Sequence, residues 1–165
     1  MPSLPARAER KWYYLGLRHL RMSQRLLRSG FADGAVFHAY HGFECLLSAV
    51  IAARGYPVPP EGWTTLLLPS GASVQAYPAP EGMIRDFNAH KARLALFDQL
   101  ADPTNAYYDA YDHLRTFLTY RDRLDSLYYE ANQNQLPEDR YSLAFGEALL
   151  PALTRFAREV RTEVP

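Results

Sequence analysis

The sequence has a single cysteine, Cys45, among its 165 residues, and it carries no net charge. One cysteine excludes an intramolecular disulfide and any zinc site built from several cysteines. The 18 basic residues balance the 18 acidic residues, so no overall charge draws the chain toward nucleic acid or a membrane. Any electrostatic function must therefore come from local patterns of charge.

Long apolar runs are missing as well. No window holds about 18 uninterrupted apolar residues, the length that would cross a bilayer. The first residues, MPSLPARAERK, lack the apolar stretch of a signal peptide. We therefore expect a cytoplasmic protein that does not insert into a membrane.

Hydrophobic periodicity and the positions of glycine and proline predict five helices. The expected helices cover residues 6–29, 33–54, 84–100, 103–130 and 137–162, with a kink at Pro151 in the last. Short links between them favour antiparallel neighbours. The predicted fold is all-α, an up-and-down bundle of four or five helices that forms one domain over residues 1–165.

Residues 56–83 are the exception to this pattern, because they hold six of the twelve prolines and three of the nine glycines. This insertion does not fit a helix. Two runs, 63–68 and 73–77, flank a Pro-Ser-Gly-Ala segment, so a small hairpin and a long surface loop are both compatible with the sequence.

Basic residues follow one side of the first predicted helix. Arg18 and Arg25 belong to a set that recurs at steps of three, four or seven and falls within an arc of about 100°. The full set is Arg7, Arg10, Lys11, Arg18, Arg21, Arg25 and Arg28, against one acidic residue, Glu9. Two interpretations remain open: a stripe that faces phosphate groups, or a solvated face that pairs with acidic residues of a neighbouring helix.

The second predicted helix is apolar on all sides, with Glu44 as the one charged residue between Gly34 and Ala53. Such a helix should be enclosed by the others. A carboxylate in this position must be paired or hydrogen-bonded, so Glu44 predicts a partner.

His38, His41 and Glu44 share one face of this helix because they are spaced three residues apart. Metal ligation is one interpretation, with His90 or the pair Asp112 and His113 as further ligands. No other predicted helix supplies a matching Glu-x-x-His motif, so hydrogen-bonded histidines are the simpler interpretation, and we expect no metal or other cofactor.

The fourth predicted helix places an ion pair within an apolar face. The face consists of Tyr107, Tyr111, Leu114, Leu118, Arg121, Asp125 and Tyr128. Arg121 and Asp125 are four residues apart, which permits an ion pair. Two interpretations remain open. Either the ion pair is partly buried and holds helices of the bundle together, or Arg121 lies in a polar cleft where it can bind an anionic ligand.

Residues 120–128, Tyr-Arg-Asp-Arg-Leu-Asp-Ser-Leu-Tyr, resemble the signature of HEPN domains, which is an Arg-x4–6-His motif on the last long core helix. Arg121 matches the arginine, Asp122 the polar residue that follows it, and Tyr128 the tyrosine that ends the motif in one subgroup. Ser126 stands where the histidine should be. The aromatic-rich helix 35–55 and the segment 90–94 are also similar to the family.

The resemblance implies a homodimer in which the two motif helices face each other across a cleft. Active members are metal-independent ribonucleases, and many are toxins paired with a nucleotidyltransferase-type antitoxin. In the subgroup whose motif ends in tyrosine, the partner adenylylates that tyrosine, which Tyr128 matches. The resemblance also implies that Arg121 binds phosphate, and that Arg121 and Asp122 are catalytic if the protein is a ribonuclease.

The missing histidine weakens the ribonuclease interpretation, because a serine cannot serve as a general base near neutral pH. His38, His41 or His113 would have to replace it. We therefore expect a module that binds nucleotide, RNA or a protein partner. In it, Arg121 contacts phosphate, Glu44 and Asp125 orient Arg121, and Arg18 and Arg25 widen the basic surface.

Overall fold

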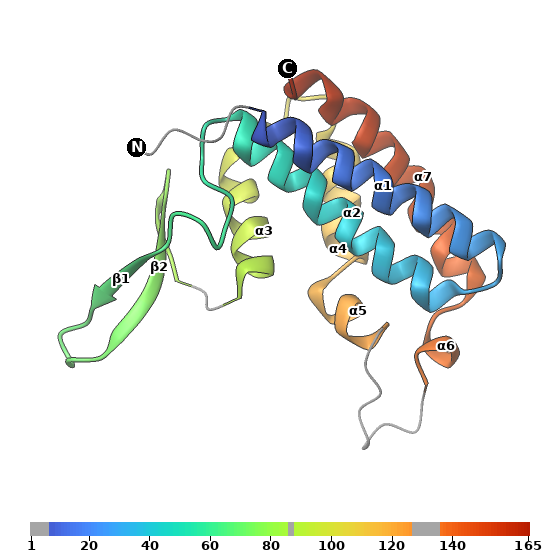
Figure 1. Ribbon diagram of the computed structural model, residues 1–165, viewed down its shortest axis with the longest axis horizontal. Coiled ribbons are helices and arrows are strands. Elements are labelled where there is room, and N and C mark those ends of the chain that lie inside the picture. Colours follow the sequence, from blue (N-terminus) through green and yellow to red (C-terminus); the bar gives the residue numbers. More distant parts are fainter. Residues whose placement is uncertain (1–6, 86–87, 127–135) are drawn as a thin grey trace.

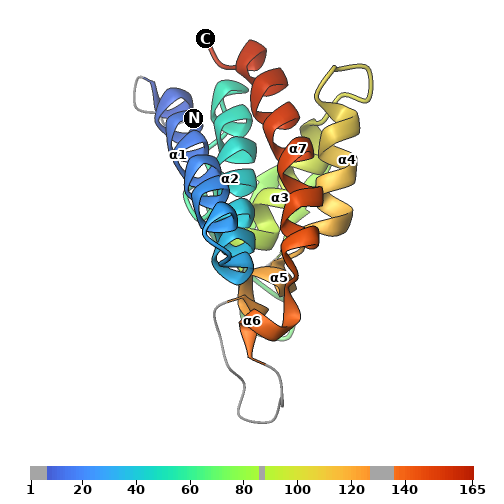
Figure 2. The same ribbon diagram turned by 90° about the vertical axis from the view of Figure 1, so that its right-hand side faces the viewer.

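The computed structural model describes residues 7–85, 88–126 and 136–165. Its first two helices, α1 (Ala8–Arg28) and α2 (Ala32–Ala53), run antiparallel and lie side by side in both views (Figures 1 and 2). Gly30 makes the turn between them with φ of 85°, which a glycine adopts without strain. Gly16 and Gly42 meet where the two helices cross. A Cβ on Gly16 would lie 3.2 Å from the carbonyl oxygen of Gly42, so the absence of side chains allows this close approach.

The Pro- and Gly-rich insertion forms a small antiparallel sheet in the order β1-β2-β3. Its strands are β1 (Thr64–Leu67), β2 (Ser73–Ala79) and β3 (Gly82–Ile84). In Figure 1 the hairpin of β1 and β2 extends away from the helices on the side of α3. Of the two structures that the sequence left open for residues 56–83, the hairpin is the one present. The all-α prediction is wrong in this segment: the protein is mainly helical with a small sheet.

The remaining helices are shorter than the sequence predicted. They are α3 (Ala89–Leu100), α4 (Tyr108–Phe117), α5 (Tyr120–Asp125), α6 (Pro137–Arg140) and α7 (Leu143–Val160), followed by a 3-10 turn at Arg161–Glu163. The predicted start of α3 at residue 84 is wrong, because β3 occupies that residue and Asn88 caps the helix a few residues later.

The predicted single helix over 103–130 is also wrong, because helix α4 ends at Phe117 and a separate helix, α5, begins at Tyr120. Thr119 has extended backbone angles and forms a capping box with Asp122, which starts a new helix. In the same way Ser142 caps α7 and separates it from α6. Pro151 lies inside α7, which continues through it to Val160.

Helix α2 is the centre of the molecule, packed against α1, α3, α5, α6 and α7. Figure 2 shows α1, α2, α7 and α4 side by side with α3 behind them. By length and composition α2 could cross a membrane, but 83% of its most apolar stretch is buried inside the protein. Burial in the bundle accounts for its apolar surface, as predicted for an enclosed helix.

Candidate functional site

Arg121 and Asp125 form the ion pair that their spacing predicted. The Arg121 Nε lies 2.9 Å from Asp125 Oδ1, and Arg140 Nη2, from α6, lies 2.7 Å from Asp125 Oδ2. The side chain of Asp125 is 5% exposed and that of Arg121 is 51% exposed. A buried carboxylate therefore holds two guanidinium groups from different helices, and half of the Arg121 side chain is open to solvent.

The polar residues beside Arg121 are engaged in local structure. Asp122 Oδ2 accepts hydrogen bonds from the Thr119 backbone N–H and hydroxyl, both at 2.8 Å, and Asp122 Oδ1 accepts one from the Tyr141 hydroxyl at 3.0 Å. Ser126 is buried, and its hydroxyl donates to the Arg123 carbonyl at 3.0 Å. The Asp122 side chain thus helps to cap the N-terminus of α5, and Ser126 is the residue that ends the helix. Tyr128 lies outside the described residues.

Glu44 has the partners that its burial predicted, and they come from α3. His90 Nδ1 lies 2.5 Å from Glu44 Oε1, and Arg93 Nη1 lies 3.3 Å from Glu44 Oε2. His41, one turn earlier on α2, approaches Oε2 at 3.9 Å. The expectation that Glu44 orients Arg121 is wrong, because the carboxylate faces α3 and pairs with these groups instead.

Sequence reasoning did not assign His90 and Arg93 to Glu44. A usable signal was present: Asn88 accepts a hydrogen bond from the His90 backbone N–H and starts α3, so His90 and Arg93 fall three residues apart on one face of a helix. That this face packs against Glu44 is a matter of tertiary structure.

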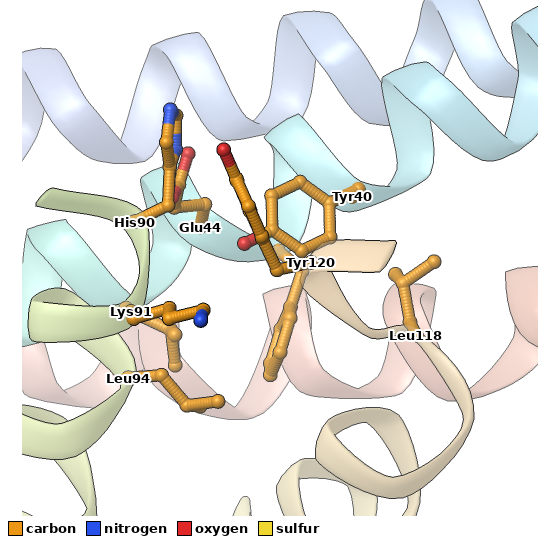
Figure 3. Close-up of a pocket in the computed structure, with 9 residues that line it drawn as sticks. Tyr40, Glu44, His90, Lys91, Leu94, Leu118 and Tyr120 are labelled. Carbon is orange, nitrogen blue, oxygen red and sulfur yellow. The ribbon is translucent and has the colours of Figure 1, made fainter. Parts of the chain in front are cut away.

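A small cavity opens beside the Glu44–His90 pair (Figure 3). Its volume is about 30 Å³, enough for one or two water molecules. Tyr40 and Tyr120 lie across it from His90 and Lys91. The Tyr120 ring stacks on His90 at 5.4 Å between centroids, and burial raises the pKa of Tyr40 above its usual range, so its hydroxyl stays protonated.

The other histidines of α2 pack against α1. His38 Nδ1 and His19 Nδ1 are 2.9 Å apart, and the His19 ring stacks on His41 at 5.5 Å. Burial lowers the pKa of His19, of His38 and of His41, the last to about 4. These rings are therefore neutral at pH 7.

The metal-site interpretation finds no support in this arrangement. Within residues 7–85, 88–126 and 136–165, no three His, Cys, Asp or Glu side chains are placed to hold a metal ion. His38 is directed to His19, and His113 packs on Phe117 at 4.7 Å on the outer surface of α4. Cys45 is buried, and burial raises the pKa of its thiol to about 12, as expected for an unreactive side chain.

The arginines of α1 are exposed, and the interpretation that pairs them with acidic residues of a neighbouring helix finds no support among the described residues. Arg18, Arg21, Arg25 and Arg28 form no ion pair or side-chain hydrogen bond with any residue that the structure describes. Arg18, Arg21, Met22 and Arg25 line a shallow hollow of about 270 Å³. The face is thus open to an anionic ligand.

Comparisons with known proteins show the fold and leave the family unassigned. No protein-family model and no curated protein matches this sequence. The crystal structure of TT1696 from Thermus thermophilus is similar, with a TM-score of 0.64 over 95% of this chain and 98% of that chain at 17% sequence identity. The two chains therefore share an overall fold over nearly their whole lengths.

Proposed function

We propose that this protein is a HEPN-like helical module that binds a phosphate group of a nucleotide or RNA at Arg121. The observation that carries the proposal is the ion pair of Arg121 with the buried Asp125, joined by Arg140. Asp125 restrains Arg121 through its Nε while half of the side chain faces solvent. A guanidinium held in one orientation loses little freedom when a phosphate binds it.

The two carboxylates of α5 do not oppose an anionic ligand at Arg121. Asp125 is buried and is shared between two guanidinium groups, those of Arg121 and Arg140. Asp122 accepts hydrogen bonds from the capping residue of its own helix and from the Tyr141 hydroxyl. A phosphate that approaches the exposed side of Arg121 would therefore meet the arginine without repulsion from an open carboxylate of α5.

In this proposal the residues that match the motif bind phosphate but do not catalyse RNA cleavage. Position 126 carries a buried serine whose hydroxyl donates to the Arg123 carbonyl, and a serine hydroxyl is not basic enough to act as a general base near neutral pH. The homodimer, the nucleotidyltransferase-type partner and the role of Tyr128 belong to this proposal through the family resemblance alone. An Arg121 site between two copies would double the positive charge at the cleft.

Replacing Arg121 with alanine should weaken phosphate binding by about 10- to 150-fold, the value of a charge-assisted hydrogen bond. The measurement is titration calorimetry with nucleoside mono- and triphosphates and fluorescence anisotropy with a labelled RNA oligonucleotide. Arg158→Ala is the matched control, since Arg158 is an exposed arginine of α7 that pairs with the adjacent Glu159.

Unchanged binding in Arg121→Ala, with the Arg158→Ala control also unchanged, would refute the assignment of the site. Thermal melting of both variants checks that the fold is intact. Arg140 still pairs with Asp125 when Arg121 is removed, so the buried carboxylate keeps a partner.

A second candidate function is a metal-independent ribonuclease, and the Glu44–His90 pair is the observation that favours it. With Nδ1 donating to Glu44, the His90 ring presents Nε2 as a proton acceptor, and a quarter of the side chain is exposed. Such a base could take the proton of a ribose 2′-hydroxyl. The hydroxyl oxygen then bonds to phosphorus, the 5′-oxygen leaves with a proton from water, and His90 returns its proton to water.

This candidate predicts cleavage of RNA in EDTA by the purified protein and at least a 100-fold loss of rate in His90→Asn, on the order expected for general-base catalysis. His113→Asn on the outer face of α4 is the control and should retain full activity. Intact RNA after prolonged incubation at high protein concentration would exclude the ribonuclease and leave the binding module.

A further inference from the structure

Four arginines and one tyrosine form a straight line on the outer face of α1. Tyr14, Arg18, Arg21, Arg25 and Arg28 follow one another at steps of four, three, four and three residues. Side chains with this spacing project from one side of a helix. At about 1.5 Å of rise per residue the four arginines span about 15 Å, and Tyr14 extends the line at its N-terminal end.

Every member of the line is exposed, and the arginine side chains are not used by the fold. None of the four makes an ion pair or a side-chain hydrogen bond with the described residues, whereas the arginines of α7 do, Arg155 with Asp109 and Arg158 with Glu159. Tyr14 is 66% exposed, so its ring is open to a ligand, and it meets the neighbouring Tyr13 ring only edge-on at 6.1 Å between centroids. Folding therefore does not explain why these side chains gather here.

We propose that this face of α1 binds single-stranded nucleic acid, with the arginines on successive phosphates and the Tyr14 ring stacked on a base. A row of guanidinium groups beside an exposed ring is the combination that single-strand binders use. The hollow lined by Arg18, Arg21, Met22 and Arg25 gives the strand a place to lie. The inference extends the proposed function to a second surface, and it does not depend on Arg121.

The ring distinguishes a single strand from the other polyanions that arginines attract. A duplex hides its bases within the stack, so Tyr14 would have no partner on it. An acidic polypeptide has no base to stack, and it would use the arginines alone. The contribution of Tyr14 to affinity therefore distinguishes a single strand from a duplex and from an acidic polypeptide.

The test is the binding of a fluorescein-labelled RNA of about 12 nucleotides and mixed sequence, long enough for one binding site of this kind, measured by anisotropy over a range of KCl concentrations. Each phosphate contact on a single strand contributes about −0.7 to the slope of log K against log salt. The double variant Arg21→Gln, Arg25→Gln should reduce that slope by about 1.4. Tyr14→Ala should weaken binding by about five- to 150-fold with the slope unchanged, and Tyr14→Phe should bind as the parent protein does.

The double variant Arg155→Gln, Arg158→Gln on α7 is the control for loss of charge and should leave affinity and slope unchanged. Three results would overturn the inference. They are an unchanged slope in the α1 double variant, equal affinity for duplex and single-stranded RNA, and competition by polyglutamate as strong as that by RNA.

The experiments distinguish a failure of the α1 surface from a failure of the proposed Arg121 site. If Arg121→Ala weakens the binding of mononucleotides and RNA while the α1 variants bind normally, the α1 surface is excluded and the Arg121 site stands. If the α1 variants lose RNA while Arg121→Ala binds normally, the Arg121 site is excluded and the α1 surface stands.

Discussion

Replacing Glu44 with alanine is expected to lower the free energy of unfolding by about 3–5 kcal/mol, because it leaves largely buried partners without their carboxylate. His90 and Arg93 would lose the oxygens that hold them at 2.5 and 3.3 Å. Arg93 would keep only its hydrogen bond to the Pro59 carbonyl and its contact with the Trp12 ring. Since both partners come from α3, the attachment of α3 to α2 should weaken most.

The measurement is equilibrium unfolding in urea, with hydrogen exchange of the α3 amides as a local readout. Glu44→Gln keeps an acceptor for Arg93 and should lose less than Glu44→Ala. Glu147→Ala, at an exposed position of α7, is the control and should change stability by less than about 0.5 kcal/mol. A loss below about 1 kcal/mol in Glu44→Ala, the net value of an ordinary hydrogen bond, would show that the pair does not hold these helices together.

Acidification should destabilise the protein between about pH 6.5 and pH 4 because of the half-buried His41. Burial is the main cause that lowers the pKa of His41 to about 4, with Arg123, His19 and His90 adding to it and Glu44 opposing it. The unfolded chain binds a proton at this histidine near pH 6.5, while the folded protein does not until about pH 4. Stability contributed by neutral His41 is therefore present above about pH 6.5 and is lost as the pH falls to about 4.

A pKa difference of this size corresponds to about 3 kcal/mol from His41 alone. His19 and His38, whose pKa values burial also lowers, add to the loss in the same direction. Urea unfolding at a series of pH values from about 7 down to about 4.5 measures this loss of unfolding free energy. His41→Gln should flatten the pH dependence, and His113→Gln, at an exposed position of α4, should leave it as steep as in the parent protein. An equally steep dependence in His41→Gln would assign the acid sensitivity to other groups.

The helical content and the central role of α2 could be predicted from the sequence, because an apolar helix of this length has to be enclosed. Glu44 is the clearest case: one carboxylate in an apolar segment requires a partner, and the structure has two close ones. The pairing of Arg121 with Asp125 also followed from spacing, since residues four apart on a helix are neighbours in any fold.

Helix ends were predicted less well, because a capping residue acts through a local hydrogen bond that periodicity does not contain. Thr119 is the main example. Apolar residues continue at helical spacing past it, but its hydroxyl and the Asp122 carboxylate form a capping box that breaks the helix. Arg121 lies on the short helix that begins after this break, and its side chain is 51% exposed.

The sequence by itself determined which side chains carry charge or an imidazole, and which of them share a helix face. Only the tertiary structure decided that Glu44 pairs with α3 rather than with Arg121, that Arg140 joins Asp125, and that no acidic helix among the described residues covers the arginines of α1. The physical reason is that spacing along a helix fixes neighbours within one turn. The packing of the whole apolar core, by contrast, sets which helix lies opposite a buried charge.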